Sequence, residues 1–493
     1  MTLLKPWWFW LIWLALAISL RWESSRWVLT HFTPDSRYYL ELATNLATGK
    51  GFSLDEPTAQ RPVHEHTPGY PLFLALIFKL VDSQPQLAET NRGVLGAIGV
   101  QSGLSLITAW LIAAACLRLT KDIQSARIIL ALGWLFPSFI ISAHYLLSET
   151  WGLFLMAGFV WGLSQERWRQ SRGRLVVLGL VFGLMSLVRP ALLVLLPAYG
   201  IWLGWFGQPW VKQRLWVFKY LLLGVLTPLI IWIARTYVTT GYLVPVQVGV
   251  GQVFLSGACP TGICQVGNLR QHWWWYSVKK AADFQAWPYG WVDLRAYRTM
   301  NQTGAKGWLG WHYLLLIGAA AGGGWALRRK GEISLWVVWW LAGSVTHQLM
   351  WSEARYALPY WLLIMPLAVL GWLTGWRKRR QMVIWWGKRW GWLGLMLVLA
   401  IYIWLPESDL GRLVWPGTRQ MAALIFWGVG LYGLGRGLFK GAKFTRGQGV
   451  IAGWWLLVIW GMMVGWWRPL RENWLPQAPV NDHLFPVARD WKF

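Results

Sequence analysis

Charged residues are scarce in this sequence, and that scarcity excludes an ordinary soluble protein. Of the 493 residues only 13% are charged, whereas soluble domains carry roughly 25%. Hydrophobic residues make up 56% and gather into runs nearly free of charge, at 4–20, 104–116, 175–188, 191–206, 220–234, 313–327, 333–350, 357–376 and 451–467. With their flanks, these runs reach the roughly 20 apolar residues that cross a hydrocarbon core, and in lipid each must be a helix. The sequence therefore predicts an all-α polytopic membrane protein.

Acidic residues are the scarcer kind of charge: 20 Asp and Glu stand against 46 Lys and Arg, a net charge of +26. The placement of the basic residues argues against nucleic acid, because they cluster between apolar runs, at 118–127, 167–174, 212–219, 328–330, 377–389 and 436–446. Such loops face the cytoplasm. If every cluster lies inside, the chain crosses the membrane about 13 times. The N-terminus is then cytoplasmic and the tail is outside. The first apolar run lacks a small-residue cleavage site and is expected to stay as an anchor helix.

Cysteine is also rare, with three in the chain. Cys116 is expected at a cytoplasmic helix end, as packing. Cys259 and Cys264 fall in an exterior loop by this topology, where two nearby thiols more often form a disulfide than a metal site.

The topology divides the chain into six parts. We expect a first transmembrane helix (1–30), an exterior catalytic loop with interfacial helices (31–87), a transmembrane bundle (88–235), an exterior loop (236–307), a second bundle (308–467) and an exterior tail (468–493). The apolar run 71–81 is too short to cross and is expected at the outer interface. No internal repeat is evident, which weighs against a transporter of duplicated halves.

The first exterior loop opens on a helix with clear ends. Thr33 is a natural N-cap, Pro34 a natural first helical residue and Gly49 a natural stop. Asp35 then lies in the first turn. The helix dipole favours an acid there without any catalytic role, so the pattern alone leaves capping and catalysis both open.

A second feature of this loop is the sequence His64-Glu65-His66, just before a proline-rich approach to the membrane. Two imidazoles and a carboxylate can ligate a divalent cation, or bind and protonate a phosphate. Adjacent side chains rarely all bind one metal, so a complete site needs ligands from elsewhere. A solvated loop is the alternative.

Ionisable residues also recur where apolar runs meet the outer surface, at Glu149, Arg189, Arg235, Glu353 and Arg355. Charges at membrane depth are costly and usually face a cavity or pathway. Several on one side, beneath an acidic loop, suggest a cavity that binds something anionic.

Taken together, the motifs resemble the C-type glycosyltransferases, in particular the bacterial branch related to protein O-mannosyltransferases and the aminoarabinose transferase of lipid A. The segments that carry the resemblance are 35–39 (DSRYY), 42–52 (LATNLATGKGF), 67–75 (TPGYPLFLA), 147–149 (LSE), 188–190 (VRP), 235–245 (RTYVTTGYLVP) and 353–359 (EARYALP). Each motif alone is weak, while their order and sidedness are more specific and cover about three-quarters of the chain. The resemblance implies a GT-C-like bundle in a bacterial inner membrane.

The resemblance also implies an activity and its residues. An inverting enzyme would take a sugar from a polyprenyl-phosphate carrier and pass it to an acceptor hydroxyl of a lipid, glycan or protein on the outer, periplasmic face. Asp35 matches the family's general base, with Glu65 and Glu149 as further catalytic acids. The expected substrate-binding residues are Arg37, Tyr38, Tyr39, His66, Tyr70, Arg189, Arg235, Arg355 and Tyr356. His66 stands where the aminoarabinose transferases have a basic residue, which weakens charge pairing with the phosphate because His is only partly charged near neutral pH.

Three other functions remain consistent with the sequence. A polymerase or ligase of surface polysaccharide would share the donor, but it normally places its key residues in a large late loop. A transporter or flippase of lipid-linked sugars would place ionisable residues near mid-membrane and break helices in paired halves. A transferase-like scaffold without activity is the third. No cofactor is certain, and a divalent metal at His64, Glu65 and His66 stays open.

Overall fold

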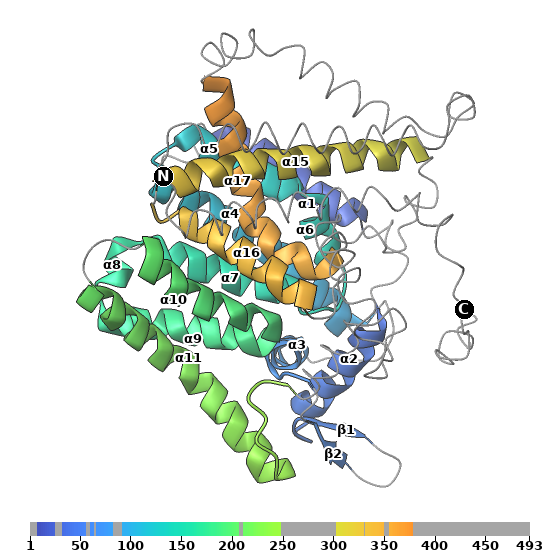
Figure 1. Cartoon of the computed structure of the whole chain (residues 1–493). Coiled ribbons are helices and arrows are strands. Elements are labelled where there is room, and N and C mark those ends of the chain that lie inside the picture. Colours follow the sequence, from blue (N-terminus) through green and yellow to red (C-terminus); the bar gives the residue numbers. More distant parts are fainter. Residues whose placement is uncertain are drawn as a thin grey trace, which may run out of the picture.

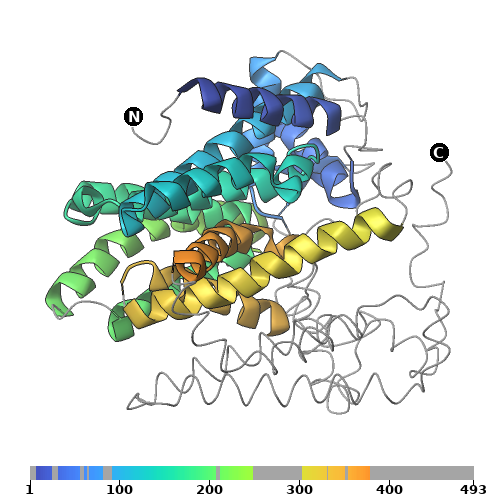
Figure 2. The ribbon, with the colours of Figure 1, turned by 90° about the horizontal axis from the view of Figure 1, so that it is seen from above.

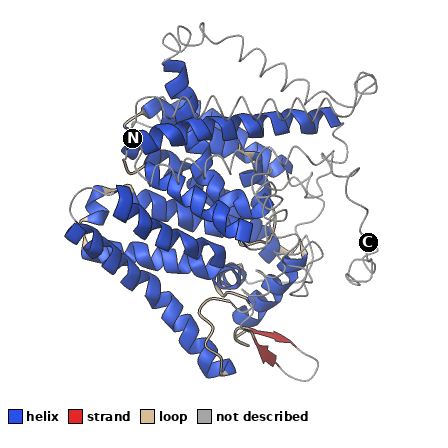
Figure 3. Ribbon diagram, viewed as in Figure 1, coloured by secondary structure: helices blue, strands red, loops and turns tan. Residues whose placement is uncertain are grey.

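The described residues form a bundle of helices with a small hairpin at one corner (Figures 1 and 3). In the computed structural model the described residues are 7–24, 32–55, 60–63, 66–81, 91–206, 211–247, 302–329, 331–349 and 354–377. The elements are α1 (Trp7–Ser24), α2 (Pro34–Ala47), β1 (Ser53–Asp55), β2 (Gln60–Pro62), α3 (Gly69–Leu80), α4 (Arg92–Thr120), α5 (Ile123–Leu135), α6 (Pro137–Ser142), α7 (Glu149–Leu163), α8 (Glu166–Arg169), α9 (Arg172–Val188), η1 (Pro190–Val194), α10 (Leu195–Phe206), α11 (Val211–Thr240), α15 (Gln302–Arg329), α16 (Ser334–Leu349), η3 (Ala354–Ala357) and α17 (Leu358–Arg377).

The helical content and apolar character confirm the predicted class, an all-α membrane protein. Among the described residues, three helical segments are long and apolar enough to cross a membrane: Arg92–Thr120, Leu215–Thr240 and Leu358–Arg377. Shorter apolar helices pack around them. α3 has 12 residues, too few to cross, as expected for a helix at the interface.

Glycines let two pairs of helices approach closely. A Cβ on Gly179 of α9 would collide with the Leu221 carbonyl oxygen of α11, and a Cβ on Gly183 would collide with Pro228. The contacts advance together along both helices, so α9 and α11 run in the same direction. α15 and α17 pack as closely (Figure 2) but run in opposite directions, because a Cβ on Gly318 would collide with Trp372 and a Cβ on Gly322 with the Leu367 carbonyl oxygen. Lipid tails offer no hydrophobic drive between helices, so such close backbone contact supplies the packing energy.

Two interruptions in the helices bring polar residues to one end of the bundle. Pro137 starts α6 directly after α5, and residues 143–148 then turn into α7. Arg189 is the extended residue after α9, and Pro190 begins η1. The apolar run 191–206 is therefore a 3₁₀ turn followed by the shorter helix α10, not one continuous helix. Proline causes both breaks, because it lacks an N–H and excludes the helical conformation of the preceding residue.

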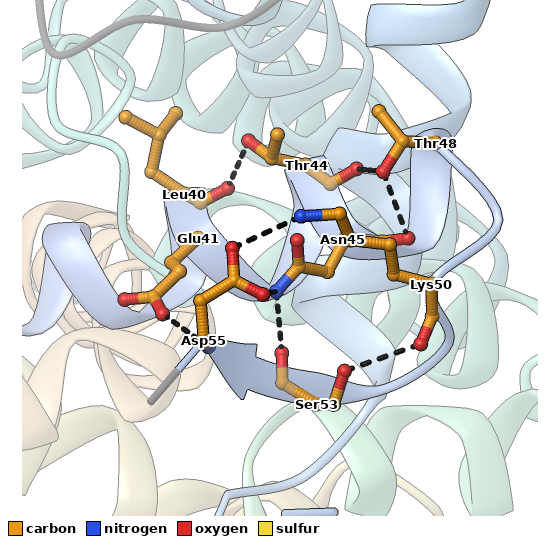
Figure 4. Close-up of polar contacts among 8 residues, drawn as sticks. All are labelled: Leu40, Glu41, Thr44, Asn45, Thr48, Lys50, Ser53 and Asp55. Carbon is orange, nitrogen blue, oxygen red and sulfur yellow. Dashed lines mark hydrogen bonds and ion pairs between the residues drawn. The ribbon is translucent and has the colours of Figure 1, made fainter. Parts of the chain in front are cut away.

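The described residues between α1 and α3 fold together, and the hairpin is tied to α2 (Figure 4). Asn45 Nδ2 donates to the Ser53 carbonyl oxygen at 2.9 Å, and the Asp55 N–H donates to Glu41 Oε1 at 2.9 Å. Lys50 pairs with the Asp55 carboxylate at 3.2 Å. Gly49 and Gly51, both with φ of +83°, form the turn between α2 and β1, a conformation that costs glycine little. This unit fixes where α2 lies over the bundle.

Several sequence predictions lie outside the described residues. They include the Cys259–Cys264 disulfide, most of the exterior loop 236–307, the apolar run 451–467 and the tail 468–493. The number of spans and the part boundaries remain predictions.

Candidate functional site

Asp35 lies where the sequence places it, in the first turn of α2. Thr33 is the N-cap, its N–H donates to Ser36 Oγ at 2.9 Å, and the two hydroxyls are 3.0 Å apart. Ser36 therefore secures the start of the helix. Asp35 is partly exposed. Its carboxylate thus gains from the helix dipole and stays accessible to a substrate.

An aromatic cluster joins α2 to the segment that precedes α3. The His66 ring stacks on Tyr38, with centroids 5.3 Å apart, and lies edge-on to Tyr39 at 6.2 Å. Tyr39 in turn lies edge-on to Tyr70 at 5.0 Å. The four predicted substrate-binding residues Tyr38, Tyr39, His66 and Tyr70 are thus brought together, although 28 positions separate Tyr38 from His66.

Glu149 and Arg189 form a buried ion pair between α7 and the end of α9. Glu149 Oε1 and Arg189 Nη1 are 2.9 Å apart, and their side chains are 3% and 8% exposed. Gly152, one turn into α7, makes room for this arrangement, because a Cβ there would lie 2.9 Å from Arg189 Cδ. The second carboxylate oxygen of Glu149 is buried and has no hydrogen-bond partner within the part of the chain that the structure describes. Buried charges are costly unless paired, so this pair holds both side chains in one place.

Tyr39 links the aromatic cluster to the ion pair. Burial raises the pKa of Tyr39 well above its ordinary value, and the negative charges of Asp35 and Glu149 raise it further. Arg189 and a hydrogen bond with Ser148 act in the opposite direction. The phenol therefore stays protonated at any physiological pH. Asp35, Glu149 and Arg189 are all near enough to Tyr39 to shift its pKa.

Tyr356, from the motif at 353–359, also lies beside the ion pair of Glu149 and Arg189. The Arg189 guanidinium carbon lies 5.8 Å from the centroid of the Tyr356 ring in η3. Tyr356 stacks on His347 at 5.6 Å, and His347 lies edge-on to Tyr360 at 6.2 Å. Residues from four distant parts of the sequence, around positions 35, 66, 149–189 and 356, thus meet at one end of the bundle.

Gln101 of α4 is a buried residue of this region that the sequence analysis missed. It accepts a hydrogen bond from the Tyr70 hydroxyl at 2.8 Å and donates to the carbonyl oxygens of Ala143 and Tyr145 at 3.0 and 2.9 Å. It thus connects α3 to the turn that leads into Glu149. A glutamine within an apolar run was the available signal, because a buried amide needs partners.

Arg235 occupies a different position from that expected of a phosphate ligand. Its guanidinium donates to the carbonyl oxygens of Val63 and Phe52, at 2.6 and 2.8 Å, and lies against the rings of Phe52 and Trp232. It braces the hairpin against α11. Arg37 is exposed on α2.

The remaining predicted site residues lie outside what the structure describes. They are His64, Glu65 and the side chain of Arg355, although the Arg355 backbone lies in η3. Among the described residues, no group of three His, Cys, Asp or Glu side chains could hold a metal ion. The proposed His64, Glu65 and His66 set is not covered by that observation.

No model of a known protein family matches the chain, and no curated protein matches it. Solved structures of the oligosaccharyltransferase of Archaeoglobus fulgidus are similar to it. One, with an inhibitory peptide and a dolichol-phosphate, has 12% identity and a TM-score of 0.45 over 93% of this chain and 56% of that chain. A second, tethered to an acceptor peptide containing the NVT sequon, has 12% identity and a TM-score of 0.43 over 94% and 56%. The apo form has 13% identity and a TM-score of 0.42 over 92% and 55%. The chain spans a little over half the length of these enzymes, and similarity of this degree does not establish a shared activity.

Proposed function

We propose that this protein is an integral-membrane glycosyltransferase that moves a sugar from a polyprenyl-phosphate carrier to an acceptor hydroxyl, with inversion. The observation that carries the proposal is the meeting of Asp35, the aromatic cluster and the Glu149–Arg189 pair around Tyr39. A partly exposed acid and a buried cation that both act on one phenol are the groups that a transfer from a phosphate leaving group needs.

Asp35 is the general base in this proposal. It accepts the proton of the acceptor hydroxyl as that oxygen bonds to the anomeric carbon of the sugar. The bond from the anomeric carbon to the phosphate oxygen breaks, and its electron pair leaves with the carrier phosphate. Attack on the face opposite the departing phosphate inverts the anomeric carbon. Protonated Tyr39, between Asp35 and the ion pair, donates a hydrogen bond to the reacting groups.

Arg189 supplies positive charge for the departing phosphate. Glu149 holds the guanidinium in place, since its carboxylate is buried against Arg189, and this favours a positioning role over proton transfer. Arg355 would add a second cation from η3. The rings of Tyr38 and His66 give the sugar an aromatic wall, which the buried Tyr70 supports through its contact with Tyr39. Glu65 remains a further candidate acid. We place the site on the exterior face of a bacterial plasma membrane, as the basic-loop topology predicts, with a lipid, glycan or protein as acceptor.

The test is transfer of labelled sugar from polyprenyl-phosphate-linked donors by membranes that carry the protein at matched levels. Positioned proton transfer is worth roughly 10²–10⁴ in rate, so Asp35→Asn should lower transfer at least about a hundredfold. Glu41→Gln is the matched control. It removes a carboxylate from the same helix but keeps an oxygen for the Asp55 N–H, and it should transfer at the parental rate.

The alternatives give different results. Equal transfer by the parent and Asp35→Asn would remove Asp35 as the base and leave it a helix-capping acid. A flippase would move lipid-linked sugar across vesicle membranes without forming a product. A polysaccharide polymerase or ligase would transfer only to a glycan acceptor.

A further inference from the structure

A second charged feature lies at the opposite end of α9 and α11. Arg172, at the start of α9, and Lys219 of α11 both approach the ring of Tyr220. The Arg172 guanidinium carbon is 5.7 Å from the ring centroid and the Lys219 ammonium is 6.0 Å from it. Trp216 lies edge-on to the same ring at 5.1 Å. Two exposed cations thus converge on one aromatic side chain.

Within the described part of the chain, neither cation has an acidic partner. Two acids have other partners: Glu166, six positions before Arg172, accepts a hydrogen bond from Gln170 at 3.0 Å, and Glu332 pairs with Arg169. The first turn of α9 contains no acid, and a cation at a helix N-terminus is disfavoured by the dipole. Two positive charges at this helix start destabilise the fold, and a bound anion would offset that destabilisation.

The surface beside Lys219 has the character of a lipid site. Lys219, Leu223, Leu226 and Ile230 follow one another at helical spacing along α11, and the three apolar side chains are 56%, 40% and 58% exposed. They belong to a segment of membrane-spanning length, Leu215–Thr240. A charged group therefore stands at the head of an apolar strip, and Trp216 and Tyr220 suit the headgroup layer.

We propose that Arg172 and Lys219 bind the phosphate of an anionic phospholipid, with Tyr220 between them and an acyl chain along Leu223, Leu226 and Ile230. The apolar strip favours a lipid over free phosphate, because a soluble anion would gain nothing from it. The site is separate from the proposed transfer site, which lies at the other end of the same helices.

Native mass spectrometry of the full chain in neutral detergent tests the proposal, with phosphatidylglycerol as the probe. Arg172→Gln and Lys219→Gln should each weaken binding about fivefold, the usual contribution of one basic residue near an anionic surface. Arg174→Gln is the matched control. It removes the same charge from the same turn of α9, but the Arg174 guanidinium donates to the Arg167 carbonyl oxygen at 3.3 Å instead, and binding should be unchanged. Arg172→Lys keeps the charge and should bind nearly as well as the parent.

Two further probes distinguish a lipid headgroup from a soluble phosphate as the bound anion. Phosphatidylcholine, with no net charge, should bind more weakly than phosphatidylglycerol, and soluble glycerol phosphate should not compete. Equal binding by the parent and both Gln variants would overturn the proposal, as would an equal loss in Arg174→Gln. Competition by glycerol phosphate at the affinity of the lipid would overturn the role of the apolar strip. A loss of binding in Arg172→Lys as large as in Arg172→Gln would contradict recognition through charge.

Discussion

Arg235 of α11 donates to the carbonyl oxygen of Val63 at 2.6 Å, although 172 positions separate the two residues. Phe52, directly before β1, accepts the Val63 N–H at 3.2 Å and receives a second hydrogen bond from the same guanidinium. His66, which contacts Tyr38 and Tyr39, is three positions after Val63 in the sequence. Arg235 thus fixes the segment that brings His66 to the candidate site.

This bracing role predicts that Arg235→Lys and Arg235→Gln behave alike. An ammonium keeps the charge but lacks the planar fork that reaches two carbonyls at once, and a hydrogen bond from a charged group contributes about 1.5–3 kcal/mol. Both variants should speed proteolysis within the hairpin and lower sugar transfer. If Arg235→Lys transfers normally while Arg235→Gln does not, Arg235 acts through its charge on the donor phosphate, as the sequence analysis expected.

The buried pair of Glu149 and Arg189 predicts strong coupling in stability. Removing one partner of a buried ion pair leaves an uncompensated charge and costs about 3–5 kcal/mol. Glu149→Gln should therefore destabilise the protein by that order, and so should Arg189→Gln. The double variant should cost clearly less than the sum. Thermal unfolding in detergent measures all three, and additive losses would show that the two side chains do not interact.

The close contact of α9 and α11 predicts that even a methyl group is harmful at Gly179. A Cβ there meets backbone of α11, and backbone cannot move aside as a flexible side chain can. Overpacking of this kind costs about 1–3 kcal/mol. Gly99→Ala on α4 is the matched control, because its Cβ would meet nothing within 4 Å. That control should unfold at or above the parental temperature, and an equal loss in both variants would contradict the packing account.

Asp122, which caps α5, predicts a loss of stability in acid. Partial burial alone would raise the pKa of Asp122. Hydrogen bonds from Arg377 and Ser125 and the charge of Arg377 outweigh that effect, and the pKa falls below its ordinary value. The contribution of the ionised group is therefore present above the unfolded-state pKa, about 3.9, and is lost as the pH falls through the lower folded value. Arg377 is half exposed, so the effect should be small. Asp122→Asn should flatten the acid limb of the unfolding temperature against pH, and an unchanged limb would show that the ion pair contributes nothing.

Local signals were sufficient to predict several features of the fold. Thr33, Pro34 and Gly49 marked the ends of α2 to within a residue or two, since caps and fixed dihedral angles act over a few residues. The apolar runs predicted the long helices for a similar reason. They did not predict the hairpin, whose three-residue strands are too short to show alternation. Nor did they predict that 191–206 opens with a 3₁₀ turn after Pro190.

For the candidate site, the sequence named most of the residues but could not assign their contacts. Glu149 and Arg189 were both singled out, yet nothing local indicates that they pair. In the sequence, Arg235 resembled Arg189 and Arg355, the other arginines expected to bind phosphate. In the structure its guanidinium donates to two backbone carbonyl oxygens. Gln101 was missed because a single amide in an apolar run has no periodic signature.

The sequence by itself determined an α-helical membrane protein and the start of α2, because hydrophobic length and capping act locally along the chain; the sidedness of its loops remains a prediction from charge placement. Only the tertiary structure decided that Asp35, His66, Glu149, Arg189 and Tyr356 lie at one end of the bundle and that Arg235 braces the hairpin. Those relationships depend on how closely glycines let helices approach and on which buried polar groups find one another. Both are set by the packing of segments far apart in the sequence.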